Sequence, residues 1–307
     1  MKEPVLLVVA GPTAAGKTWL GAKLAAHLGG EVISADAFAV YRGMDIGTAK
    51  PDAGLRSLVP HHLLDIADPR ERYSAGQFMR DADAVIADCW ARGKQPVVVG
   101  GTLFYVSSLL YGLFPEPPKD ENLRRKLRRQ WQANPEALRQ QLRQLDPVLA
   151  ARLSPNDRQR IMRALEVCLV SGRPMSELWA HHPVNTPRYR FLLLALCPPR
   201  AALHARIVKR VEDMWQRGLL AEAERLVNAG VPRQAHAFSA IGYRQALGVL
   251  AGDLTVVEAK EETTVATRQL AKRQFSWLRR ERNCRMLPGF GEEVLDQALA
   301  AWEANFG

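Results

Sequence analysis

The sequence has few cysteines and no long apolar segment. Its four cysteines are widely spaced and form no C-x-x-C pair, which excludes a cysteine-rich zinc site or a disulfide framework and fits a reducing cytoplasm. The longest apolar runs, Val5–Ala10 and residues 191–197, are far too short to cross a bilayer, so we expect no membrane partner. Because Val5–Ala10 leads into Gly-Pro, we interpret it as a buried strand and not as a signal peptide.

Positive charge is spread unevenly over the 307 residues, whose formal net charge is +10. Residues 1–118 are near neutral, with 11 basic against 12 acidic side chains. Residues 119–163 hold 12 against 5, and residues 268–285 hold 7 against 1. Clustered basic surplus is typical of proteins that bind a polyanion such as nucleic acid, although two solvated helix faces would give the same pattern.

The N-terminal segment contains a phosphate-binding motif in a suitable setting. The strand Val5–Ala10 leads into Gly-x-x-x-x-Gly-Lys-Thr at residues 11–18, and an amphipathic helix follows. In such a P-loop the glycines let backbone N–H groups converge on a phosphate at the positive end of the helix. Lys17 adds a full positive charge, and the Thr18 hydroxyl can hold Mg²⁺. The motif therefore predicts a site for a diphosphate-like group.

Strands alternate with helices over the first third of the chain. Residues 31–36 and 95–102 have the pattern of buried strands, residues 61–66 that of a short edge strand, and residues 37–51 that of a loop. Residues 74–77, Ser-Ala-Gly-Gln, form a capping box, and apolar residues with helical spacing follow it. The alternation predicts an α/β fold with a P-loop parallel-sheet core.

The ligand of such a sheet lies at the carboxyl ends of its strands. Thr18, Asp36 and Thr102 each stand at or just past such an end. We therefore expect these three residues to meet around one pocket.

The pattern changes near residue 115. From there to about residue 178 only helical patterns occur, broken before three prolines; Ser154 as N-cap with Pro155 at the first helical position predicts one helix start. Residues 189–196 have the pattern of another core strand. Helical patterns then cover residues 200–216, 219–228 and 256–280, and a last one begins near residue 292.

These patterns divide the chain into three parts. We predict the first part of the core over residues 1–114, an inserted all-helical domain over residues 115–187, and a return to the core with a helical C-terminal region over residues 188–307.

The usual hydrolytic partner of a P-loop is not evident. Kinases and nucleotide triphosphatases normally carry a second acid at a strand end that helps to hold Mg²⁺. The strand over residues 95–102 ends in Gly-Gly-Thr instead, and periodicity places Asp88 in the middle of a helix. A phosphate cradle without that acid points to transfer of a group other than phosphate. Whether ATP also binds in the loop stays open.

An ordered set of segments resembles the bacterial tRNA dimethylallyltransferases. They span nearly the whole chain, at residues 11–18, 34–36, 40–51, 61–69, 99–105, 159–166, 214–222, 241–244 and 267–279. The resemblance implies a cytoplasmic, Mg²⁺-dependent enzyme that transfers a dimethylallyl group from dimethylallyl diphosphate to N6 of the adenosine adjacent (3′) to the anticodon of tRNA. We expect a monomer, with the helical insertion binding tRNA.

The resemblance also implies roles for individual residues. Asp36 is the candidate general base and Thr102 its partner at the substrate base; an Asp or Thr after a strand can instead simply cap a turn or helix. Diphosphate binding falls to Gly11, Thr13, Ala14, Ala15, Gly16, Lys17, Thr18 and, as a second cation, Arg217, with Thr18 also the metal ligand. Binding of tRNA falls to Asp36, Ala37, Phe38, Ala39, Thr102, Gln159, Arg160, Ile161, Met162, Arg163, Arg244, Lys272 and Arg273.

One departure and three alternatives accompany this interpretation. The family normally has serine where this chain has Ala37, which removes a hydroxyl beside Asp36. A transferase acting on free adenine nucleotides would not need the basic insertion. A P-loop kinase and a nucleotide-switched RNA-binding protein without chemistry are the other two alternatives.

Overall fold

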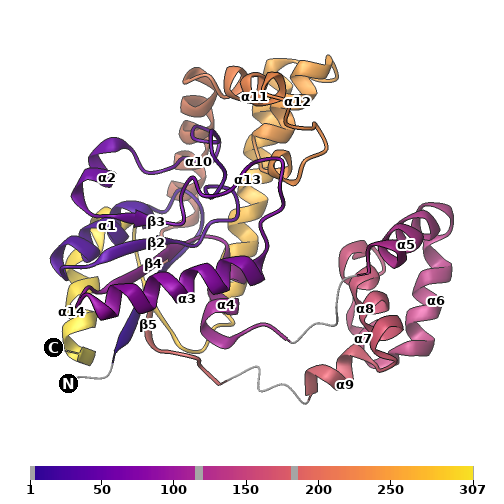
Figure 1. Cartoon of the computed structure of the whole chain (residues 1–307). Coiled ribbons are helices and arrows are strands. Elements are labelled where there is room, and N and C mark those ends of the chain that lie inside the picture. The colour runs from indigo at the N-terminus through magenta and orange to yellow at the C-terminus, as the bar shows by residue number, and fades with distance from the viewer. Residues whose placement is uncertain (1–3, 115–119, 181–185, 307) are drawn as a thin grey trace. The chain divides into compact units, whose positions relative to one another are not determined.

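The computed structural model describes residues 4–114, 120–180 and 186–306. The chain forms two compact units, one of residues 1–110 and 188–307 and the other of Tyr111–Pro187 (Figure 1). The predicted insertion, residues 115–187, falls inside the second unit, which begins four residues earlier.

The first unit is built on a sheet of six parallel strands in the order β3-β2-β4-β1-β5-β6. The strands are β1 (Val5–Ala10), β2 (Glu31–Ser34), β3 (His61–His62), β4 (Pro96–Gly100), β5 (Arg190–Leu196) and β6 (Cys284–Leu287). The central β1 is buried at every position, as its uninterrupted apolar sequence predicts. The predicted α/β fold with a parallel sheet is therefore confirmed.

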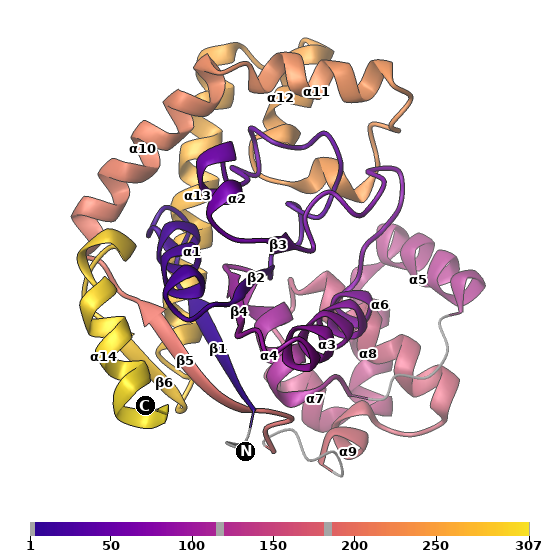
Figure 2. The same ribbon diagram turned by 60° about the vertical axis from the view of Figure 1, so that its left-hand side comes forward.

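Helices cover both faces of this sheet. The helices of this unit are α1 (Lys17–His27), α2 (Ala53–Leu58), α3 (Ala75–Ala91), α4 (Leu103–Tyr111), α10 (Arg200–Gln216), α11 (Leu219–Asn228), α12 (Tyr243–Ala251), α13 (Val256–Leu278) and α14 (Leu295–Phe306), with 3₁₀ turns η1 (His236–Ser239) and η2 (Gly291–Glu293). Of these, α11 and α12 pack mainly on each other and on α10 and α13, away from the sheet (Figure 1). Figure 2 shows α1 and α14 on one face and α3 on the other. None of the helices in the described ranges combines the length and the apolar character that crossing a bilayer requires.

Backbone contacts bring the ends of β2 and β4 together. A Cβ atom on Gly100 would lie 2.1 Å from the carbonyl oxygen of Ala35, so only glycine permits this approach. The N–H of Thr102 donates to the same carbonyl at 3.3 Å. The residues that follow the two strands are thereby placed side by side.

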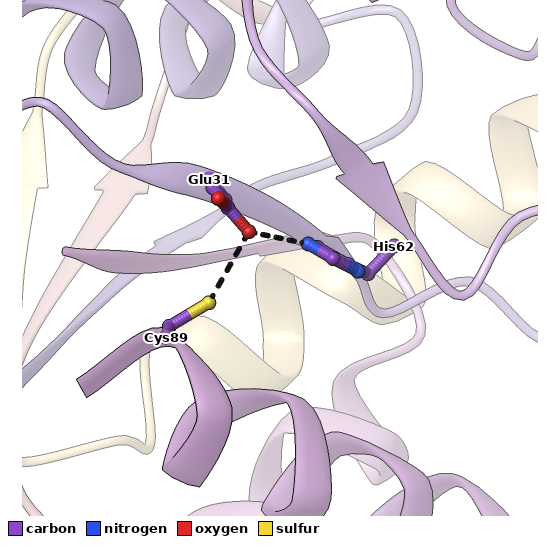
Figure 3. Close-up of side chains that lie close together, drawn as sticks. All are labelled: Glu31, His62 and Cys89. Carbon is purple, nitrogen blue, oxygen red and sulfur yellow. Dashed lines mark hydrogen bonds and ion pairs between the residues drawn. The ribbon is translucent and has the colours of Figure 1, made fainter. Parts of the chain in front are cut away.

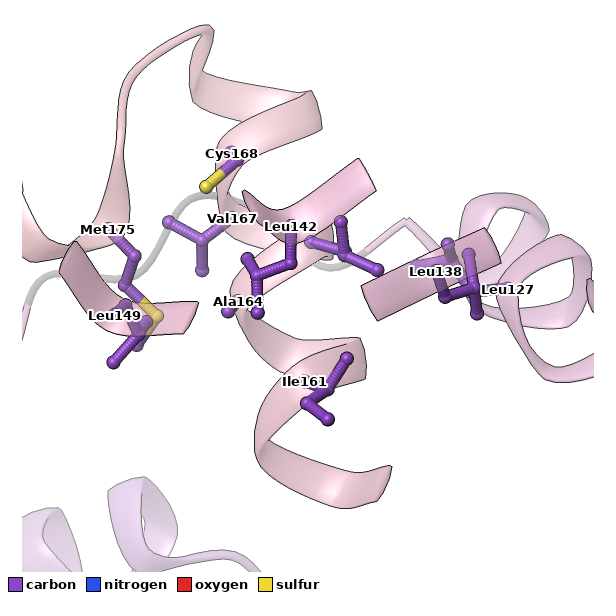
Figure 4. Close-up of a cluster of buried hydrophobic side chains, with 10 residues drawn as sticks. Leu127, Leu138, Leu142, Leu149, Ile161, Ala164, Val167, Cys168 and Met175 are labelled. Carbon is purple, nitrogen blue, oxygen red and sulfur yellow. The ribbon is translucent and has the colours of Figure 1, made fainter. Parts of the chain in front are cut away.

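The second unit consists of short helices around its own apolar core (Figure 4). They are α5 (Glu121–Ala133), α6 (Pro135–Leu145), α7 (Pro147–Arg152), α8 (Arg158–Ser171) and α9 (Met175–Ala180). Leu127, Leu142 and Leu165 are at most 1% exposed. Glu166, 3% exposed, is paired with both Arg124 and Arg163, which neutralises its charge inside the unit.

The predicted start of α8 is wrong by several residues. The N-cap is Asp157, whose carboxylate accepts a hydrogen bond from the N–H of Arg160 at 3.2 Å. Ser154 and Pro155 lie in the preceding turn, where the Ser154 hydroxyl accepts from the N–H of Asn156. Two overlapping capping signals compete here, and the acidic one, closer to the apolar stripe, prevails.

Candidate active site

A cavity of about 520 Å³ opens at the carboxyl ends of β2 and β4. Thr18, Asp36 and Thr102 all line it, as their positions after strands predict. Its walls also include residues that the sequence interpretation did not assign: Arg210 on α10, and Leu270, Gln274 and Trp277 on α13. The cavity is thus formed by the sheet end, the loop after β2 and two helices from the second half of the chain.

The P-loop has an unusual backbone conformation that its sequence only partly explains. Gly16 has φ +85°, where glycine is favoured, but Ala14 also lies in the left-handed region at φ +65°. A Cβ on Gly16 would lie 2.7 Å from a Glu292 carboxylate oxygen, and the carbonyl of Ala15 accepts from the N–H of Gly291 at 2.9 Å. The loop is therefore packed against η2, which holds it in this shape.

Two cations are withdrawn from water beside the P-loop. The pKa of Lys17 is lowered to about 7, mainly because of desolvation and further because of the nearby Arg210; Asp36 opposes this change. Desolvation also lowers the pKa of Arg210, again opposed by Asp36. The Lys17 ammonium donates to the carbonyl oxygen of Pro12 at 2.7 Å. An anion entering the cavity would meet two poorly hydrated positive charges.

Asp36 is fixed by the turn that follows β2. Its Oδ1 atom accepts hydrogen bonds from the N–H groups of Phe38 at 2.8 Å and Ala39 at 3.0 Å. This is the turn-capping arrangement that Asp favours after a strand, and it orients the carboxylate within the cavity wall. Capping and a role as base are compatible, because each carboxylate oxygen offers its own lone pairs.

The side chain of Thr102 is joined to this turn, while its carbonyl accepts from N–H groups in the first turn of α4. Its hydroxyl oxygen accepts from the N–H of Ala37 at 3.0 Å. The contact uses only the backbone of Ala37, so the methyl side chain there does not disturb it.

Gln274 joins α13 to the site through both ends of its amide. The oxygen accepts from the N–H of Thr13 at 2.9 Å, and the nitrogen donates to the carbonyl of Gly101 at 2.7 Å. The side chain is 5% exposed. The N–H of Thr13 is thus already occupied by a protein partner.

The loop over residues 37–51 has the irregular structure that was predicted, and buried charges hold it in place. The carboxylate of Glu222 accepts from the N–H groups of Asp45, Ile46 and Gly47 and from the Tyr243 hydroxyl. Lys50 donates to the carbonyl of Tyr41 and to the Asp45 and Asp65 carboxylates. All these residues lie in segments of the family resemblance, yet their positioning role could not be seen from spacing alone.

A second hollow of about 780 Å³ shares Lys17 and Thr18 with the first. Its basic lining consists of Lys17, Lys50, Arg56, Arg210 and Arg217. Arg217, predicted as the second phosphate-binding cation, is exposed at the end of α10, whereas Arg210 lines both hollows.

The residues predicted to bind tRNA fall into several environments. Ala37, Phe38, Ala39 and Arg273 line the cavity, while Lys272 on α13 and Arg244 on α12 are exposed. In α8, Gln159 and Arg160 are exposed and Met162 is half-buried. Ile161 is 3% exposed, so its side chain belongs to the core of the second unit, and Arg163 pairs with Glu166 at 2.7 Å. Surface contacts in α8 are therefore left mainly to Gln159 and Arg160.

The Thr18 hydroxyl fits a role as ligand of Mg²⁺. Thr18 lines both hollows, and within the described residues its hydroxyl has no protein hydrogen-bond partner. Mg²⁺ takes few protein ligands and fills its other positions with water and substrate phosphates. The strand β4 ends in Gly100 without an adjoining acid, so no second carboxylate is supplied from there.

Glu31, His62 and Cys89 form a cluster of potential metal-ligating atoms at the far end of β2 (Figure 3). The carboxylate of Glu31 is held by both terminal nitrogens of Arg92, at 2.6 and 2.8 Å. This pairing, together with His62, lowers the pKa of Glu31 to about 2, and burial raises that of the Cys89 thiol to about 11. The carboxylate is paired with a guanidinium and the thiol stays protonated, so these groups are not arranged to bind a metal. The cluster is a structural ion-pair network.

The sequence profile of the family described as IPP transferase matches residues 39–281. The chain is 49% identical over 282 residues to a protein of Anaeromyxobacter sp. (strain Fw109-5) named tRNA dimethylallyltransferase, covering 90% of this chain and 92% of the relative. It is 44% identical to the protein of that name from Koribacter versatilis (strain Ellin345), with 96% of each chain covered.

Solved structures with this fold carry related titles. The full-length tRNA isopentenylpyrophosphate transferase of Bacillus halodurans is 34% identical, with a TM-score of 0.73 over 98% of this chain and 96% of that one. A eukaryotic dimethylallyltransferase described as acting on tRNA is 27% identical, with a TM-score of 0.83 over 98% of this chain and 78% of that one.

The lowered pKa of Lys17 predicts pH-dependent binding of inorganic diphosphate. The ammonium is charged below about pH 7 and becomes neutral above it, so affinity should fall as the pH rises from 6 to 8.5. In the Lys17→Arg variant the side chain stays protonated over the whole range. Diphosphate itself changes ionisation in the same way for both proteins, so the ratio of their affinities reports on Lys17 alone. By calorimetric titration we expect the ratio of the two dissociation constants to change about tenfold over this range. Parallel pH profiles would contradict the assignment.

The Glu31 network predicts a second pH effect, on stability. Because the pKa of Glu31 is depressed from 4.5 to about 2, its contribution is full above 4.5 and is lost as the pH falls towards 2. Glu31→Gln should lower the thermal midpoint by several degrees at pH 7, with the difference from wild type narrowing in acid. Asp88→Asn is the control, since that carboxylate also pairs with Arg92 but is 61% exposed. Equal losses in both variants would refute the burial argument.

Proposed function

Since the chain belongs to the IPP transferase family and transfers a prenyl group to tRNA, we propose that it takes the dimethylallyl group from dimethylallyl diphosphate. The acceptor is N6 of the adenosine adjacent, on the 3′ side, to the anticodon. The observation that carries this proposal is that the carboxylate of Asp36 and the cations Lys17 and Arg210 belong to the wall of one cavity.

The cations act on the leaving group. As the allylic carbon–oxygen bond breaks, negative charge develops on the departing diphosphate, and groups already oriented towards it stabilise that charge most effectively. Lys17 and the free N–H groups of the P-loop contact this charge, with Arg210 as the second cation. Arg217 contacts the diphosphate from the exposed side of the second hollow.

Asp36 acts on the nucleophile. The exocyclic amine of adenine is weakly nucleophilic, so its proton must be removed as the new carbon–nitrogen bond forms. The Oδ2 atom of Asp36 accepts that proton while Oδ1 keeps its two backbone hydrogen bonds. Thr102 orients the turn that carries Asp36 and lies beside the bound base.

A stacked adenine cannot reach a cavity of this kind, so the nucleotide must leave the anticodon stack. Basic side chains hold the RNA through phosphate contacts meanwhile. The exposed Lys272, Arg273 and Arg244 serve this purpose in the first unit, and Arg160 in the second, where the uncharged Gln159 adds a hydrogen-bonding group.

The proposal also covers the metal ion, the oligomeric state, the location in the cell and the ligand of the P-loop. Thr18 holds Mg²⁺, which when bound neutralises part of the diphosphate charge. We propose that the enzyme acts as a monomer in the cytoplasm and that dimethylallyl diphosphate, rather than ATP, is the ligand of its P-loop.

Asp36→Asn tests the chemistry. The asparagine oxygen can still accept from Phe38 and Ala39, but the amide cannot take a proton, so transfer should fall at least about 100-fold while tRNA affinity changes little. The measurement is mass spectrometry of nucleosides from tRNA incubated with labelled dimethylallyl diphosphate. Joint loss of transfer and binding would assign Asp36 a structural role, and absence of labelled adenosine with wild type would refute the proposed reaction.

The salt dependence of binding tests the tRNA surface. Lys272→Gln and Arg160→Gln should each weaken binding at every tRNA sequence and reduce the slope of log affinity against log salt by about 1. Lys94→Gln, at an exposed lysine in the turn between α3 and β4, is the matched control and should leave the slope unchanged. If all three variants keep the wild-type slope in fluorescence anisotropy, these side chains make no phosphate contact.

A further inference from the structure

Phe104 is exposed in a helix that is otherwise withdrawn from solvent. Of the nine residues of α4, all of them described, Phe104 alone is classed as exposed, at 63%. Its neighbours Leu103 and Tyr105 are 6% and 5% exposed. Single apolar residues on a surface are common, so exposure alone does not indicate a function and the position of the residue must be considered.

Phe104 lies at the mouth of the proposed active site. It lines the 520 Å³ cavity and yet keeps most of its surface in solvent, which places the ring at the rim. Thr102 and Arg273 line the same cavity. The ring therefore shares one cavity with a residue assigned to the substrate base and a cation assigned to the RNA backbone.

The backbone that carries the ring is well held. The Ser108 hydroxyl donates to the carbonyl of Phe104 at 2.6 Å, and the N–H of Tyr105 donates to the carbonyl of Thr102 at 2.8 Å. The other phenylalanine of the cavity, Phe38, already stacks on His236 with ring centroids 5.8 Å apart. Phe104 has no such ring partner among the described residues and is 63% exposed, so ring surface is left for a ligand.

We propose that Phe104 is a stacking platform for a nucleobase of the tRNA that neighbours the extruded adenosine. The inference rests on the proposed function: extrusion breaks the stack and leaves an adjacent base with an uncovered face. Proteins that bind unstacked RNA bases commonly cover such faces with aromatic rings. A rigidly held ring at the cavity rim, beside Thr102, is placed to do so.

The test uses an anticodon stem-loop with 2-aminopurine beside the target adenosine, since the fluorescence of this base falls when it stacks. We expect wild type and Phe104→Trp to quench it on binding. Phe104→Ala and Phe104→Leu should lose the quenching and raise KM for the RNA roughly tenfold, with kcat nearly unchanged. The Leu variant separates stacking from apolar contact, and Val257→Ala, 66% exposed on α13, controls for loss of an exposed apolar side chain away from the cavity.

Two outcomes would overturn the inference. One is unchanged quenching and KM in Phe104→Ala; the other is full activity in Phe104→Leu, which would make the contact merely apolar. Both outcomes require a control in which mass spectrometry shows that the wild-type enzyme modifies the unlabelled stem-loop. Lack of modification by wild type would instead be a failure of the proposed function.

Discussion

The shape of the site depends on one buried carboxylate, that of Glu222. The loop over residues 37–51 contains no helix or strand, so its backbone N–H groups need partners from elsewhere. Glu222, 2% exposed, accepts from three successive N–H groups and from the Tyr243 hydroxyl, which balances the cost of removing a negative charge from water. A residue on α11 thus fixes a cavity wall that lies some 175 positions earlier in the sequence.

The cations beside the P-loop lack such compensation. Lys17 and Arg210 are desolvated and close enough to depress the pKa of Lys17, and Asp36 compensates only in part. Such an arrangement opposes folding, because two partly desolvated positive charges lie near each other with only partial compensation. It is expected where a polyanionic ligand completes the site, since binding then relieves the repulsion. Proteins commonly retain locally unfavourable arrangements of this kind at functional sites.

Local sequence signals predicted the parts of the fold that local physics controls. The capping box of α3 is present, with Ser74 and Gln77 bonded to each other's backbone, and α10 and α11 begin and end at the predicted residues. The edge strand β6 and the helix α12 were missed, because one is short and half-exposed and the other follows a glycine without a conventional cap. Arg210, Gln274 and Glu222 were missed for a different reason: each acts through contacts with segments distant in sequence.

The helix α13 illustrates why such residues escape a linear interpretation. Its basic side chains led to the prediction of tRNA binding, because a cluster of charges is visible in the sequence. Its other face places Gln274 against the P-loop and the Gly-Gly-Thr turn, and adds Leu270 and Trp277 to the cavity. Because these contacts issue from one continuous helix of 23 residues, a displacement of its basic face would be transmitted to the N–H of Thr13 and the carbonyl of Gly101. The basic face of α13 and the P-loop are therefore parts of one connected structure, although 261 residues separate Thr13 from Gln274 in the chain.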